Sequence, residues 1–166
     1  MTPALECHLV RASRRWPAGL HVLARAAIDA ARAEIPLRLD GPAEISVLLT
    51  SDAGQRRLNA RWRGIDRPTN VLSFAARDEG APLAGPLGDI SLGFETVCRE
   101  AERDRVPLAH HFAHLLVHGF LHILGYDHLT EADAGKMESL EARILARLDI
   151  PDPYAGAPLV LASADD

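Results

Sequence analysis

The residues best suited to chemistry are three histidines, His118, His122 and His128, at spacings of four and six. On a helix, residues four apart share one face with their Cβ atoms about 5–6 Å apart, so two ring nitrogens can reach one metal ion at about 2.0–2.1 Å. Gly125 stands where a helix can end in a left-handed turn, which lets His128 supply a third nitrogen. Three neutral imidazoles with one open position are typical of a catalytic zinc site. The spacing therefore predicts one Zn²⁺ per chain, held by these histidines.

The same spacing occurs in the metzincin signature HExxHxxGxxH. Those proteases place their general base, a glutamate, directly after the first histidine, and this chain has Gly119 there. Without that carboxylate the site has no obvious protease base. Peptidase activity is therefore a minor hypothesis, although a zincin-like arrangement of the metal-site helix is expected.

Two further residues are candidates for catalysis. His114 lies one helical turn before His118 and could position a ligand, transfer a proton or contact a substrate phosphate. Its spacing equally allows a packed helix histidine. Arg63 could present its guanidinium to a phosphate, although solvated arginines in a turn would explain the same segment. Asp89 could pair with an arginine, support a histidine or occupy a turn, and His110 and His111 receive no role.

The elements that must position these residues follow from hydrophobic periodicity. Strands are predicted at 6–10, 44–50, 71–74 and 88–93, and helices at 20–31, 52–61, 95–105, 107–125 and 131–148. This order favours an α+β fold, with a small mixed four-stranded sheet packed against about five helices. Residues 1–154 are expected to form one domain and residues 155–166 a flexible tail.

Composition limits the class of protein. The chain has 166 residues, of which 48% are hydrophobic and 25% charged, as in an ordinary globular domain and unlike a disordered, collagenous or coiled-coil chain. Its two cysteines lie far apart, and the start of the chain shows no secretion signal, so a reducing cytoplasm is expected. Residues 106–126 carry no Asp, Glu, Lys or Arg but hold five histidines, which favours a buried helix over a membrane span.

Charge is divided unequally along the chain. The net charge is -5, yet residues 1–75 carry 11 arginines against 7 acidic residues, and residues 76–166 carry 7 basic against 16 acidic ones. A cluster of arginines can bind phosphates. A solvated, arginine-rich surface is the alternative interpretation of the same charges.

Several motifs together resemble one protein family. Arg63-Gly64, the PTNVLSF segment at 68–74, LGDI at 87–90 and the histidine motif at 118–128 occur in the order seen in the bacterial YbeY rRNA maturation factors. The resemblance covers about residues 44–154. It implies a single-strand-specific, metal-dependent endoribonuclease that acts in 16S rRNA 3′-end maturation and late ribosome quality control.

The resemblance also implies site residues and partners. It implies zinc on the three histidines, and importance of Arg63 and His114 for RNA cleavage. Single-stranded rRNA and the small ribosomal subunit or its proteins are the implied partners. Trp62 stands where relatives often have tyrosine, which keeps an aromatic ring for stacking.

Two other functions compete with this interpretation. One is a ribosome-assembly binding factor whose zinc is structural, and the other is a zincin-like metallohydrolase acting on another substrate. Structural zinc sites normally have four protein ligands, whereas the motif offers three and no fourth Cys or His nearby. The motif therefore favours an enzyme.

Overall fold

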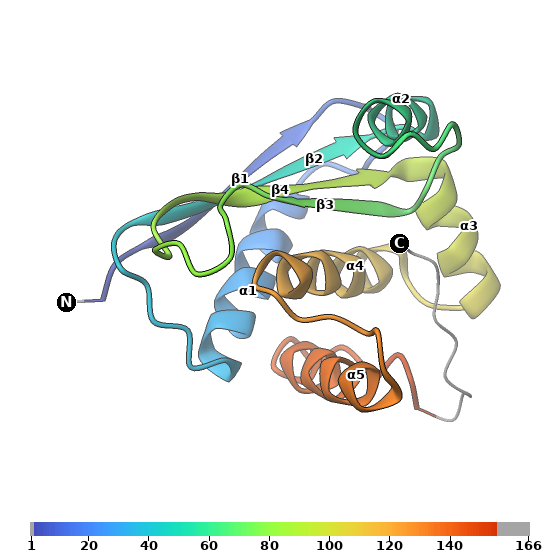
Figure 1. Cartoon of the computed structure of the whole chain (residues 1–166). Coiled ribbons are helices and arrows are strands. Elements are labelled where there is room, and N and C mark those ends of the chain that lie inside the picture. Colours follow the sequence, from blue (N-terminus) through green and yellow to red (C-terminus); the bar gives the residue numbers. More distant parts are fainter. Residues whose placement is uncertain (1, 156–166) are drawn as a thin grey trace.

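The computed structural model describes residues 2–155 and confirms the predicted α+β fold (Figure 1). The predicted tail, apart from residue 155, lies outside the described residues. Four strands and five helices follow one another in an order close to that expected from the sequence. They are β1 (Leu5–Arg11), α1 (Leu20–Glu34), β2 (Ala43–Thr50), α2 (Asp52–Arg63), β3 (Val71–Ala75), β4 (Gly85–Gly93), α3 (Phe94–Asp104), α4 (Leu108–Ile123) and α5 (Glu131–Ala146).

The sheet is mixed, with the strand order β1-β2-β4-β3. β2 runs parallel to both β1 and β4, whereas β3 pairs antiparallel with β4. Among the described strands β3 pairs only with β4, so its outer edge is open. Helix α4 packs closely against β3.

The two faces of the sheet are covered differently. α2 lies over one face at one end of the strands, and α4 lies against the opposite face with α5 beyond it (Figure 1). Side chains alternate along a strand, and on β4 Ser91 faces Gln55 of α2 while Ile90 faces Gly119 of α4. Residues of α2 and residues of α4 are therefore separated by the sheet.

Helix α4 is the central helix of the core. It packs against the sheet, α1, α3 and α5, and its buried residues include Phe112 and Phe120, both with no exposed surface. This confirms the buried helix expected for the uncharged segment. No helix in the described part of the chain is long and apolar enough to cross a membrane.

Gly119 shows why α4 can approach the sheet so closely. A Cβ atom added there would lie 3.2 Å from Cγ2 of Ile90, closer than side chains normally pack. The side chain of any other residue at this position would start against Ile90 on the apolar face of the sheet. Glycine at the position of the protease base therefore agrees with the close packing of α4 against β4.

Candidate metal centre

The three histidines of the motif converge as predicted. His118 and His122 lie one turn apart on α4, and their Nε2 atoms are 3.0 Å apart. The chain leaves α4 through Gly125, whose φ of 102° is the left-handed conformation that glycine adopts readily. This turn returns His128 to within 5.2 Å of the His122 ring, measured between ring centroids. One nitrogen from each histidine lies within 4.8 Å of the others, so the group could hold a metal ion.

The surroundings of His122 leave one of its ring nitrogens available to bind a metal. Burial, together with the nearby His118 and His128 rings, lowers the pKa of His122 to about 4. The His122 imidazole is therefore neutral at pH 7. A neutral imidazole offers the lone pair that a metal requires.

A buried carboxylate from another helix supports this group. Glu141 of α5 has a fully buried side chain, and its Oε2 atom lies 2.7 Å from Nδ1 of His118. A hydrogen bond donated by Nδ1 leaves Nε2 of His118 unprotonated and directed toward His122 and His128. Carboxylates that hold a metal-binding histidine in this way fix both its tautomer and its ring orientation. The donor set therefore fits a metal ion that prefers nitrogen ligands.

Glu141 is itself held by two further side chains. His114 Nε2 lies 2.8 Å from Oε1 of Glu141, and the Tyr154 hydroxyl donates to the same oxygen at 2.5 Å. Burial raises the pKa of Glu141, but the hydrogen bonds from His114 and His118 outweigh it and bring the value to about 2. The carboxylate is therefore ionised at neutral pH, with three partners around it.

We expect Glu141→Gln to weaken metal binding about 10- to 100-fold, the usual cost of removing a residue that orients a metal ligand. The amide keeps the size of the side chain but replaces a charged acceptor by a neutral one. Zinc affinity measured against a competing chelator checks this. Glu102→Gln, an exposed substitution on α3, is the control and should leave affinity unchanged. Equal affinities in both variants would contradict the assignment.

The sequence assigned no role to Glu141 or Tyr154, because their contacts with the histidines of α4 join different elements of the fold. Glu141 could have been recognised as a carboxylate on the apolar side of α5. It adjoins Leu140 and precedes Ile144, both of which are buried. A charged residue in such a position is almost always paired.

A second, partly buried group continues the histidine row of α4. His111, which received no role from the sequence, lies 2.8 Å from Glu100 of α3 through its Nε2 atom. The Asn70 amide donates to the same carboxylate at 3.0 Å and accepts a hydrogen bond from the Val71 backbone at 2.6 Å. These contacts fasten the start of β3 to α3 and α4. These hydrogen bonds give Asn70 of the PTNVLSF segment a structural role.

Arg63 and Asp89, which the sequence also singled out, lie outside the group of three histidines. Arg63 is the exposed last residue of α2, on the helix across the sheet from α4 (Figure 1). Asp89 lies within β4 rather than in a turn, and it is exposed. Since neighbouring Ile90 faces α4, Asp89 faces the opposite side of the sheet and does not support a histidine of α4.

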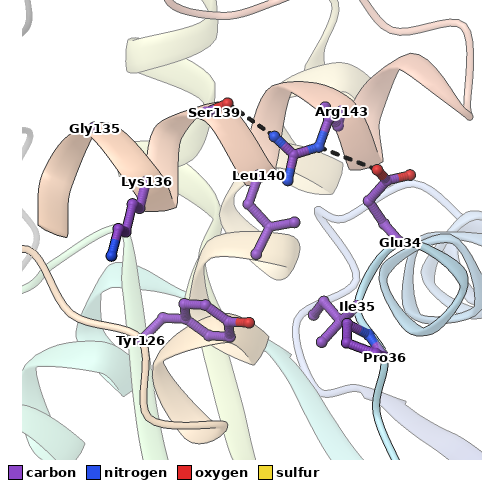
Figure 2. A pocket seen from close by; sticks show the side chains of 9 residues that line it. All are labelled: Glu34, Ile35, Pro36, Tyr126, Gly135, Lys136, Ser139, Leu140 and Arg143. Carbon is purple, nitrogen blue, oxygen red and sulfur yellow. Dashed lines mark hydrogen bonds and ion pairs between the residues drawn. The ribbon is translucent and has the colours of Figure 1, made fainter. Parts of the chain in front are cut away.

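A separate hollow of about 460 Å³ lies between the end of α1 and α5, beside Tyr126 (Figure 2). None of the three histidines lines it. Arg143 spans it, donating to Ser139 at 2.9 Å and to Glu34 at 3.1 Å, and Arg147 donates to Glu34 at 2.6 Å. These ion pairs connect α5 to α1 at the surface, beside the buried apolar residues of α5.

Comparison with known proteins agrees with the geometry. The family model described as "Endoribonuclease YbeY" matches residues 14–149. The chain belongs to the YbeY family. Among its relatives, the endoribonuclease YbeY of Nitrobacter hamburgensis is 49% identical over 158 residues, covering 92% of this chain and 83% of the relative. That of Chelativorans sp. is 51% identical over 160 residues, covering 93% and 96%.

One solved structure shares the fold. The solution structure of TM1509 from Thermotoga maritima superposes with a TM-score of 0.58 at 21% identity, covering 86% of this chain and 91% of that protein. Such low identity supports the α+β architecture alone. The YbeY relatives support an endoribonuclease role, and with it an RNA substrate.

Proposed function

We propose that this YbeY protein is a zinc-dependent endoribonuclease of the cytoplasm. Its proposed substrate is single-stranded rRNA of the small ribosomal subunit, which it processes in 16S rRNA 3′-end maturation and late ribosome quality control. The two free cysteines, Cys7 and Cys98, fit a reducing compartment. The observation that carries the proposal is the convergence of three imidazoles. Within the part of the chain that the structure describes, no fourth His, Cys, Asp or Glu belongs to this group. That leaves a coordination position for water or a phosphate oxygen.

Each residue has a proposed task. Zinc would be held by His118, His122 and His128, where it supplies Lewis acidity and lowers the pKa of bound water toward 7. Glu141 keeps the ligand nitrogen of His118 directed inward. Arg63 would neutralise charge on the phosphate that is cut.

His114 has a more specific environment than its spacing indicated. Its Nε2 atom contacts Glu141 and lies 3.0 Å from the Tyr154 hydroxyl. This contact supports the positioning role, because His114 holds the carboxylate that holds His118. Proton transfer by His114 stays a prediction, and it would use the other ring nitrogen, Nδ1.

A cleavage assay with controlled metal content tests the proposed function. A single-stranded RNA carrying the 3′ end of 16S rRNA should be cut by the zinc-loaded chain, spared after chelation and cut again when zinc is restored. The same sequence in duplex form should be spared. Cleavage that survives chelation, or that is equal on both forms, would overturn the proposal.

The arginines of α2 should contribute to RNA affinity. Arg57 is exposed, whereas neighbouring Arg56 is paired with Asp66 at 2.7 Å. We expect Arg57→Glu to weaken RNA binding and reduce its salt dependence, since each phosphate contact on a single strand contributes a log–log slope of about -0.7. Binding titrations at several salt concentrations measure this.

The control for this prediction is Arg25→Glu, an exposed arginine on α1 whose ion pair with Asp29 stays within that helix. Arg143 and Arg147 are unsuitable as controls because both bind Glu34 and secure α5. If Arg25→Glu and Arg57→Glu weaken binding equally, the arginine-rich end of α2 is not an RNA-binding surface.

A further inference from the structure

The two tryptophans of the chain have opposite environments. Trp16 has no exposed surface, and its indole nitrogen donates to the backbone oxygen of Thr50 at 2.7 Å. Trp62, in the last turn of α2, is 62% exposed. It is the only aromatic residue among the exposed large hydrophobic residues that the structure describes. The fold therefore uses Trp16 for its core and leaves most of Trp62 in solvent.

The surroundings of Trp62 are cationic. The Arg61 guanidinium lies over its ring at 5.1 Å from the centroid. Residues 56–67 carry five arginines against one aspartate, a net charge of +4 in a chain of net charge -5. Asp66 is already bound by Arg56, so it does not compensate the charge beside Trp62. An exposed aromatic ring among arginines is complementary to a nucleobase and its phosphates.

The position of Trp62 relates it to β3. Its ring lies 6.5 Å from that of Phe74, inclined at 57°. Phe74 pairs with Asp89 in the register of β3 and β4, and therefore faces the side of the sheet that carries α2. His118 and His122 lie on α4, which covers the other face of the sheet (Figure 1). An RNA strand that contacts both Trp62 and these histidines would pass the outer edge of β3.

We propose that Trp62, assisted by Arg61, is a stacking platform for a base of the single-stranded RNA substrate. This inference rests on the proposed function and specifies how the substrate is held. The platform binds a base through its π face, so it tolerates any sequence but requires an unpaired nucleotide. It also requires an oligonucleotide long enough to reach from the histidine group past β3.

Tryptophan fluorescence tests the platform directly. The chelator-treated full chain, which should not cut RNA, is titrated with a single-stranded RNA oligonucleotide. Stacking on Trp62 should quench the exposed component of the emission and leave that of Trp16. Trp62→Ala should weaken binding about 5- to 150-fold, the range for loss of one stacked base. Trp62→Phe should recover most of the affinity while abolishing the quench.

Two controls isolate base stacking. Val22→Ala, which alters a residue of α1 with 66% exposure, should not change affinity. An oligonucleotide of the same length with abasic sites should bind the parent and Trp62→Ala equally, because it keeps the phosphates and removes the bases. A Trp62→Ala variant that binds the intact RNA as tightly as the parent, or a parent whose emission does not respond, would overturn the platform.

Cleavage by the zinc-loaded chain is measured separately and distinguishes this proposal from the proposed function. Quenching without cleavage would support the platform and contradict the endoribonuclease assignment. If the parent and Trp62→Ala cleave RNA with the same KM, on long and on short oligonucleotides alike, the result would support the endoribonuclease activity and overturn the platform. If Trp62 instead contacted a protein partner, RNA affinity would not depend on it, and the platform would be overturned.

Discussion

Replacing His122 by alanine is expected to empty the metal site and reduce RNA cleavage to background. His122 supplies one of three converging nitrogens, and its loss leaves only His118 and His128. A bound metal contributes several kcal/mol to the stabilisation of a phosphoryl transition state, so cleavage should fall about a thousandfold or more. Metal content by elemental analysis and cleavage of single-stranded RNA measure the two effects.

The fold should survive this change. His122 is only partly buried, and the core of α4 consists of separate apolar residues such as Leu116 and Phe120. The circular dichroism spectrum should therefore match that of the parent. His110→Ala, on the first turn of the same helix, is the matched control and should keep its metal. Full metal occupancy in the His122→Ala variant would remove this residue from the ligand set.

The histidine group was predictable because its geometry is mainly local. Two ligands four residues apart need only a helix, and the third needs only the turn that Gly125 permits. The strands were predictable for a similar reason. Ile45, Val47 and Leu49 alternate in sequence, and all three are buried on one side of β2. Such patterns depend on neighbours within one element.

The surroundings of the histidines were not predictable in the same way. Glu141 reaches His118 because α5 packs against α4 and α1 through buried residues such as Leu140 and Ile144. His111 meets Glu100 because α3 packs against α4. No spacing within one segment indicates which helices become neighbours. These contacts follow from tertiary packing, and the sequence offered only the hint of a carboxylate on an apolar helix face.

One part of the setting of Arg63 is local in sequence, and the other depends on tertiary packing. Its place at the end of an arginine-rich helix and before glycine is local, and Gly64 ends α2 with a φ of 71° as that order suggests. Its relation to the histidine group is not local, because α2 and α4 lie on opposite faces of the sheet (Figure 1). Any joint action of Arg63 and the histidines therefore depends on the tertiary fold and on a substrate that contacts both.

Arg63→Ala is expected to keep its metal and its folded spectrum, and to lose RNA cleavage by about 10²–10³-fold. Losses of this size follow removal of one group that stabilises a developing oxyanion. Arg63 is exposed at the end of α2, and its removal should leave the contacts of Glu141 and the three histidines unchanged. Single-turnover cleavage, measured beside metal content, separates an effect on the reaction from an effect on the metal.

The shape of the guanidinium sharpens this prediction. A guanidinium can donate two parallel hydrogen bonds to two phosphate oxygens, whereas a lysine ammonium acts as a point charge. Arg63→Lys should therefore recover only part of the lost rate. Arg67→Ala, which removes another exposed arginine four residues further on, should affect RNA affinity modestly and leave the single-turnover rate at saturation unchanged. If Arg63 is instead a solvated residue at a helix end, Arg63→Ala and Arg63→Lys will both cleave at the parent rate, and Arg63 then has no part in the reaction.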